Sequence, residues 1–214
     1  MLKSNGDLGI FLALLAIFAH SAAWSEGLAQ ALNPGEKKAI RRELQLPISD
    51  FSLTDQFGRA FWFHSLRGRV VLLSFVYTSC PDVCPLITAS ALAVQKALRA
   101  REREYVSLLT VTTDPEVDTP AVLKSYAGRF GADMSNWSFL TGDVSALAPV
   151  WKSFGVKVKR KGRGLVDHTP LTALVDRRGI LRVVYVASSP DSKLILRDIR
   201  ALMPNLPPAG VPKA

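Results

Sequence analysis

The stretch RVVLLSFVYTSCPDVCP, from Arg69 to Pro85, joins a nearly unbroken apolar run to the only two cysteines of the chain, Cys80 and Cys84. A run of this length, rich in Val, Leu and aromatic residues, is typical of a strand buried on both faces of a sheet. Such strands belong to parallel or mixed sheets that are covered by helices. The stretch therefore predicts an α/β fold in which both cysteines follow the end of a central strand.

The segments on either side predict the rest of this fold. Alternating apolar residues around the turn Asp55–Gly58 predict an N-terminal β-hairpin. Thr119 before Pro120, and Asp143, are expected to cap two helices. Helices are predicted over residues 86–104, 119–130, 144–154 and 193–202, and further strands over 106–112, 138–141, 171–175 and 181–186. This order of elements predicts an α/β sandwich with a mixed central sheet.

The N-terminus has the features of an export segment. Lys3 precedes the apolar stretch from Leu8 to Ala19, and small residues follow it. We therefore expect an extracytoplasmic protein of a bacterium, located in the periplasm, either secreted or tethered to the inner membrane. We expect an export signal or anchor, a linker, one domain and a flexible tail, over residues 1–24, 25–47, 48–203 and 204–214 respectively.

The charge of the chain is strongly basic. Its 214 residues carry a formal net charge of +9, and the run KVKRKGR, from Lys157 to Arg163, holds five cations and no acid. Such a run can bind an acidic protein or an anionic membrane surface, or it can be a solvated loop. No aromatic residue interleaves with the run, so we expect no nucleic-acid partner.

Two prolines determine where the cysteines lie. Pro81 disfavours a helix at Cys80, and Pro85 is tolerated only in the first turn of a helix, so Cys80 is expected in a loop and Cys84 at a helix start. The helix N-terminus stabilises a thiolate, which predicts thiols more acidic than usual. The spacing permits a disulfide, and an oxidising compartment favours one. Because a bridge across so small a loop stabilises little, a reactive pair is favoured over a structural disulfide.

His168 is the candidate for a third ligand beside the sulfurs. It stands in VDHTP, two residues before Pro170 and just ahead of a predicted strand. If Thr169–Pro170 is the cis-proline that faces the cysteine loop in thioredoxin-like folds, His168 lies beside Cys80 and Cys84. Two thiolates and an imidazole suit Cu(I), or Cu(II) with a further ligand, whereas zinc usually takes a fourth ligand. From the residues alone, a metal carrier and a dithiol enzyme both stay open.

Three motifs together resemble the Sco/SenC family of copper metallochaperones: YTSCPDVCP at 77–85, VTTDPEVDTP at 111–120 and VDHTP at 166–170. The resemblance extends over most of residues 48–202. It implies a thioredoxin-like three-layer sandwich, an N-terminal tether or export signal, and a copper ion, Cu(I) or Cu(II), bound by Cys80, Cys84 and His168. Family members help to assemble the dinuclear copper centre of cytochrome c oxidase, by delivering copper, by reducing the cysteines of the recipient subunit, or both.

The resemblance also implies partners and leaves alternatives open. The partners are the copper-accepting subunit of cytochrome c oxidase and a copper donor or thiol reductant. In one alternative, Cys80 and Cys84 are the redox-active pair of a thiol-disulfide oxidoreductase in extracytoplasmic redox control; in another, the protein scavenges peroxide like a peroxiredoxin. Asp114 and Asp118 are expected at the same strand-end face, in turn and cap roles. Asp167 is expected to point away from the site.

Overall fold

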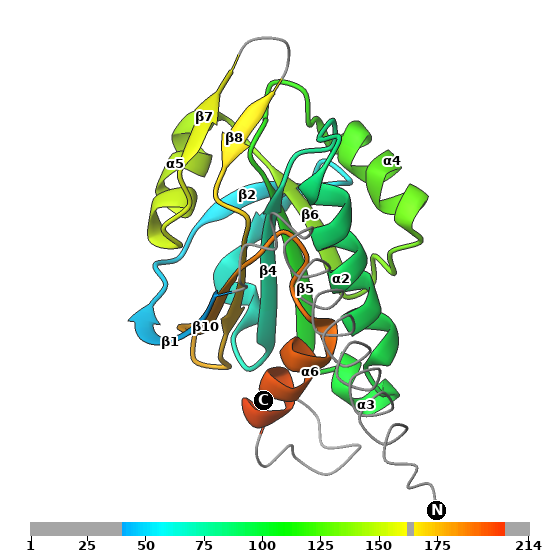
Figure 1. Cartoon of the computed structure of the whole chain (residues 1–214), viewed down its shortest axis with the longest axis vertical. Coiled ribbons are helices and arrows are strands. Elements are labelled where there is room, and N and C mark those ends of the chain that lie inside the picture. The colour runs from blue at the N-terminus through cyan, green and yellow to red at the C-terminus, as the bar shows by residue number, and fades with distance from the viewer. Residues whose placement is uncertain (1–39, 162–164, 204–214) are drawn as a thin grey trace, which may run out of the picture. The chain divides into compact units, whose positions relative to one another are not determined.

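The computed structural model describes residues 40–161 and 165–203. Its centre is a mixed eight-stranded sheet with the order β1-β10-β9-β4-β5-β6-β2-β3, and β7 and β8 form a separate two-stranded sheet (Figure 1). The strands are β1 (Ile40–Pro47), β2 (Ser52–Asp55), β3 (Ala60–Trp62), β4 (Val70–Val76), β5 (Val106–Thr112), β6 (Trp137–Thr141), β7 (Val158–Arg160), β8 (Val166–His168), β9 (Leu171–Val175) and β10 (Ile180–Val186). The helices are η1 (Phe63–Leu66, a 3-10 helix), α2 (Val83–Ala97), α3 (Ala100–Arg103), α4 (Pro120–Phe130), α5 (Val144–Ser153) and α6 (Ser192–Ala201).

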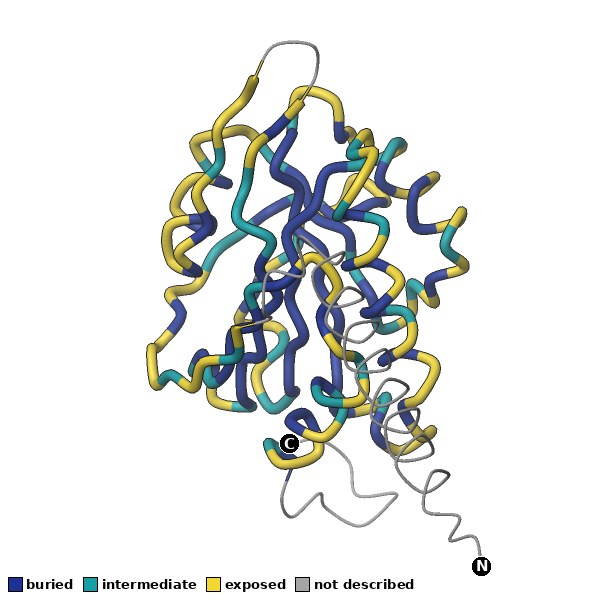
Figure 2. Tube along the Cα trace, in the orientation of Figure 1, coloured by how far each residue is buried: buried dark blue, intermediate teal, exposed yellow. Residues whose placement is uncertain are grey.

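The central strand β4 is buried on both faces, as predicted. All seven of its residues are buried, and alternate side chains enter two different cores. Val70 and Leu72 pack in the core beneath α2, α4 and α6, whereas Leu73 and Phe75 pack in the core beneath α5. Figure 2 shows this burial as dark blue strands between helices whose outer sides are exposed. The arrangement confirms the three-layer α/β sandwich.

Other predicted elements are also confirmed. β2 and β3 form the N-terminal hairpin, with Ser52 opposite Trp62. Thr119 and Asp143 cap α4 and α5 by accepting hydrogen bonds from backbone N–H groups. The helix predicted over 86–104 differs, because the structure has α2 and then the short α3. Leu98 adopts an extended conformation between them, with a ψ of 129°, and ends α2.

Residues 40–47, which the sequence analysis places in a linker, instead form strand β1. β1 pairs antiparallel with β10, so that Ile40 lies opposite Val186 and Pro47 opposite Ile180. Most residues of β1 are exposed at the sheet edge, so this segment lacks the apolar alternation that predicts a strand. Within the described residues the sheet therefore begins at Ile40, eight residues before the expected domain start at Ile48.

Several predictions fall on parts of the chain that the structure does not describe. The expected export segment, the rest of the linker and the tail from residue 204 lie outside the described residues. Among the helices of residues 40–161 and 165–203, none has the length and apolarity needed to cross a bilayer.

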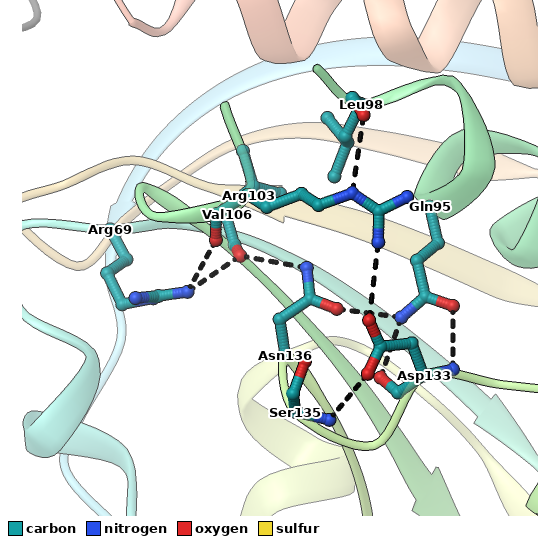
Figure 3. A network of polar contacts seen from close by, with 8 residues as sticks. All are labelled: Arg69, Gln95, Leu98, Arg103, Val106, Asp133, Ser135 and Asn136. Carbon is teal, nitrogen blue, oxygen red and sulfur yellow. Dashed lines mark hydrogen bonds and ion pairs between the residues drawn. The ribbon is translucent and has the colours of Figure 1, made fainter. Parts of the chain in front are cut away.

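A polar network stabilises the end of the sheet opposite the cysteines (Figure 3). The Gln95 amide donates to the Asp133 carbonyl at 2.8 Å and to Asn136 Oδ1 at 2.7 Å, and it accepts from the Asp133 N–H at 3.0 Å. Asn136 and Arg69 both donate to the carbonyl of Val106, the first residue of β5. The network thus joins α2 to the loop that precedes β6.

Candidate metal and thiol site

The two cysteines lie where the sequence predicts, at the carboxyl end of β4. Cys80 is in the loop, and Cys84 is the second residue of α2. The Cys84 N–H donates to the Cys80 sulfur at 3.5 Å, and both thiols are free. Cys84 is fully buried, whereas Cys80 is partly exposed. The pair is therefore asymmetric: Cys80 is accessible to solvent and Cys84 is covered.

The β7–β8 hairpin brings His168 to these sulfurs. His168 is the last residue of β8, and its Nε2 lies 3.4 Å from Cys84 Sγ. Its Nδ1 lies 3.1 Å from the Thr169 carbonyl, which can only accept, so Nδ1 carries the proton and Nε2 keeps its lone pair. The expected cis peptide before Pro170 is not found, because the described residues contain no cis bond. Strand pairing between β7 and β8, and not a cis-proline, places the imidazole.

Burial alters the acidity of all three groups. It raises the pKa of the Cys84 thiol and lowers the pKa of His168, so both are neutral at pH 7. Burial also opposes ionisation of Cys80, but hydrogen bonds from the Asp82 N–H, from Cys84 and from the Tyr77 hydroxyl lower the pKa of Cys80 below its usual value. The prediction that Cys84 is unusually acidic is therefore wrong, since desolvation outweighs the helix N-terminus, and acidity is confined to Cys80.

Tyr77 is a site residue that the sequence analysis missed. Its ring meets the His168 ring edge-on with the centroids 5.8 Å apart, and its hydroxyl forms a hydrogen bond with Cys80. Burial, followed by that hydrogen bond, raises the pKa of Tyr77 to about 12. The only signal in the sequence is its position, directly after the buried strand and three residues before Cys80.

Asp118 anchors the start of the cysteine loop. Its buried carboxylate accepts hydrogen bonds from the Thr78 N–H at 3.2 Å, from the Thr78 hydroxyl at 2.5 Å and from the Thr112 hydroxyl at 2.5 Å. Burial raises the pKa of Asp118. The indole N–H of Trp151 donates to the Thr112 carbonyl at 3.0 Å from the other side of the strand. Asp118 thus has the expected structural role at the strand-end face.

The basic run forms intramolecular ion pairs where the structure describes it. Arg160 Nη2 lies 2.6 Å from Asp114 Oδ1, and its Nη1 pairs with Glu116. Lys161 pairs with Asp167 at 3.1 Å, and both of these side chains are mostly exposed. Asp167 and Lys161 nevertheless line a pocket together with Cys80 and His168, so Asp167 does not point away from the site as expected. Arg163 lies outside the described residues.

The geometry agrees with comparisons to known proteins. The SCO1/SenC family model matches residues 41–204. This chain belongs to the SCO1/SenC family. A solved SCO1/SenC family lipoprotein from Bacillus anthracis str. Ames is 30% identical, with a TM-score of 0.68 and coverage of 78% of this chain and 99% of that chain. Its fold confirms the thioredoxin-like architecture.

Two further solved structures of the Sco family are similar to this chain. BsSco, described with a disulfide switch and as a member of the Sco family of cytochrome c oxidase assembly proteins, is 30% identical, with a TM-score of 0.66 and coverage of 76% and 96% of the two chains. ScoI of Bradyrhizobium japonicum, solved with copper bound, is 31% identical, with a TM-score of 0.60 and coverage of 74% and 99%.

In this SCO1/SenC chain the site opens to solvent through a pocket of about 300 Å³. Its lining includes Tyr77, Cys80, Val83, Leu165 and His168. Cys84 lies beneath the lining, covered by Val166 and other apolar residues of the same cluster. A partner therefore reaches Cys80 and the imidazole before it reaches Cys84.

The donor atoms of the SCO1/SenC site fit a soft cation. Two sulfurs and a neutral imidazole nitrogen form the ligand type that Cu(I) prefers, and metal binding would displace the thiol protons. Within the described residues, no three His, Cys, Asp or Glu side chains are arranged as a complete metal cage. Cys84 and His168 are already in contact, and the Cys80 sulfur lies beside Cys84, where it accepts the Cys84 N–H.

Proposed function

We propose that this chain carries copper on Cys80, Cys84 and His168 and helps to assemble the dinuclear copper centre of cytochrome c oxidase. The observation that carries the proposal is the 3.4 Å approach of His168 Nε2 to Cys84 Sγ, made by residues that are 84 positions apart in the chain. Copper bound to B. japonicum ScoI and the family description of BsSco support it.

The chemistry of the site supports reversible binding. The neutral imidazole offers a lone pair without first losing a proton, and the exposed Cys80 is the more acidic thiol. Bound copper would be held by two thiolates and this imidazole, ligands from which another thiolate-rich site can take it. The proposed recipient is the copper-accepting oxidase subunit, with a copper donor or thiol reductant upstream.

The proposed location is extracytoplasmic, in a bacterial periplasm, with a tether to the membrane. It rests on the apolar N-terminal sequence and on the lipoprotein nature of the B. anthracis relative. A periplasmic location would expose the domain to an oxidising environment, where a free dithiol needs a reductant to stay reduced.

Thiol-disulfide exchange is a second candidate function, because Cys80 is accessible and has a lowered pKa. Cys80 would attack a disulfide of the recipient, and Cys84 would resolve the mixed disulfide, leaving the recipient reduced and Cys80–Cys84 oxidised. The disulfide switch of BsSco agrees with such a pair. A peroxidase role would instead require catalytic turnover of peroxide with a thiol donor.

The decisive experiment is a copper titration of the reduced protein, followed by absorption in the thiolate charge-transfer region. We expect His168→Ala to weaken Cu(II) binding by about tenfold or more and to change the band, because it removes one ligand. His64→Ala is the matched control, since His64 is exposed and pairs with Asp50 at 2.6 Å. Equal binding by wild type and His168→Ala would refute the copper role and leave thiol exchange, which His168→Ala should retain.

A further inference from the structure

The β7–β8 hairpin holds His168 but has no strand pairing with the main sheet. It forms a separate two-stranded sheet of three residues on each side, and in Figure 1 it extends beyond the end of the central strands. In its register Val158 lies opposite His168, and Arg160 lies opposite Val166. Any displacement of Arg160 is therefore transmitted through the ladder to the strand that ends at His168.

We propose that Arg160 is a positioning residue, whose ion pairs with Asp114 and Glu116 hold the hairpin so that His168 faces Cys84. The proposal rests on the proposed function of the site, and it adds a residue that contacts neither the cysteines nor the imidazole. It also gives Arg160, one cation of the basic run, a structural role. The sequence analysis left that run as a solvated loop or a partner-binding surface.

Asp114 is the stronger of the two ion-pair partners of Arg160. It is 1% exposed, Arg160 donates to its Oδ1, and its Oδ2 has no hydrogen-bond partner in the described part of the chain. A buried carboxylate without a cation is strongly unfavourable, so this pair resists separation. Glu116 is 62% exposed in its side chain, so solvent screens its pair with Arg160 and weakens it.

The same loop also holds the cysteines. The Asp114 carbonyl accepts the N–H groups of Val117 and Asp118, which closes the loop into a tight turn. Asp118 then binds Thr78, two residues before Cys80. Arg160 therefore connects the hairpin that bears His168 to the Asp114–Asp118 loop. The same loop holds the segment before Cys80, so the histidine and the cysteines are both positioned by it.

The proposal is tested by comparing Arg160→Gln with Lys159→Gln. Lys159 is the neighbouring residue of β7, is exposed and has no ion pair among the described residues, so both variants lose one charge from one strand. The first measurement needs no metal: alkylation of Cys84 in a Cys80→Ser background, with amide hydrogen exchange of residues 166–169. We expect Arg160→Gln to accelerate both by about tenfold, because the hairpin opens more often, and Lys159→Gln to leave both unchanged.

The second measurement is a double-mutant cycle with His168→Ala, scored by Cu(II) affinity. If Arg160 acts through the imidazole, Arg160→Gln should weaken binding by about three- to tenfold in wild type and by less than about twofold in His168→Ala. Arg160→Lys, which keeps the charge but not the two-pronged contact with both acids, should fall between Gln and wild type.

Three outcomes separate the possibilities. Equal results for Arg160→Gln and Lys159→Gln would overturn the proposal, and so would the same loss of affinity in both histidine backgrounds, which indicates general destabilisation. If wild type and His168→Ala bind copper equally, the proposed function fails, while Cys84 alkylation and amide exchange still decide whether Arg160 closes the hairpin. If Arg160→Gln does not fold, Arg160→Lys is compared with Lys159→Gln instead, with the smaller effect expected of it deciding the outcome.

Discussion

Cys80 and Cys84 are four residues apart but occupy different environments. Cys84 is covered by the hairpin and has a raised pKa, because burial disfavours its thiolate. Cys80 faces the pocket, and its pKa lies below the usual value because several hydrogen bonds favour its thiolate. Reactivity at mildly alkaline pH should therefore belong to Cys80 alone.

This difference predicts an order of alkylation. At pH 8 the single-cysteine variant Cys84→Ser, which keeps Cys80, should react with iodoacetamide at least about tenfold faster than Cys80→Ser, because only the thiolate attacks and Cys84 remains protonated well above this pH. Mass spectrometry of the labelled chains measures both rates. In denaturant the two rates should become equal, and equal rates in the folded protein would contradict the assignment.

At the residue scale the sequence identified the candidate ligands but not their surroundings. Cys80, Cys84 and His168 stand in motifs that can be read directly from the sequence. Tyr77 and Arg160 were missed, because their contacts join segments up to 91 residues apart and no local pattern marks them. The acidity of Cys84 was mispredicted for the same reason, since burial depends on the packing of distant segments.

At the scale of elements, the polar network around Gln95 in α2 predicts a large loss of stability on substitution. Gln95→Leu would leave the Asp133 N–H and carbonyl and the Asn136 side chain without this partner inside the protein. We expect the free energy of unfolding to fall by about 2–3 kcal/mol, because three partly buried hydrogen bonds are lost at roughly 1 kcal/mol each. Urea denaturation measures this loss, and Lys96→Gln on the exposed side of α2 should cost little.

Glu102 in α3 joins this short helix to α6 and gives a pH-dependent contribution. Burial opposes its ionisation, but hydrogen bonds from Arg200 and Arg99 prevail and lower its pKa from 4.5 to about 2. The folded state therefore favours the carboxylate: the stabilisation is complete above about pH 4.5 and is lost as the pH falls towards 2.

The corresponding prediction concerns acid unfolding. Glu102→Gln should lose on the order of 1–2 kcal/mol at pH 7, a value reduced for the exposure of both arginines, and its difference from wild type should shrink to near zero at pH 2. Thermal unfolding at a series of pH values measures the difference. A difference that stays constant with pH would show that Glu102 acts through packing alone.

Elements with strong local patterns were predicted well, and those without were not. The apolar runs of β4 and β5 and the Thr119–Pro120 cap of α4 give boundaries within about two residues of the observed ones. β1 and the hairpin β7–β8 have mostly exposed residues and no apolar period, so only their pairing partners reveal them as strands.

At the scale of the whole described domain, the edge strand β1 predicts the effect of truncation. A chain that starts at Ile48 would leave β10 with an unpaired edge and remove the contact of Arg41 with Asp198 at 2.7 Å. We expect its midpoint of thermal unfolding to be lower by about 5–10 °C than that of a chain that starts at Ile40. Light scattering should also show more aggregation, and identical behaviour of the two chains would mean that β1 is dispensable.

The topology explains why distant motifs meet. β4 and β5 run parallel, so their carboxyl ends place the cysteine loop and the Asp114–Asp118 loop at the same end of the sheet. β9 runs antiparallel to β4, so the chain enters β9 at this same end of the sheet, shortly after His168. Sequence order alone does not contain this proximity, because it arises from the order in which the strands pair.

Trp151 supplies the site with a built-in optical reporter. Its indole bonds to Thr112, which bonds to Asp118, which in turn holds the segment before the cysteines. Of the other described tryptophans, Trp62 is exposed and Trp137 is buried in the opposite core, so their emission provides a steady background. Because these contacts connect the indole to the cysteine segment, we expect Trp151 emission to change when copper enters or leaves the proposed site, so that intrinsic fluorescence would follow the transfer in real time.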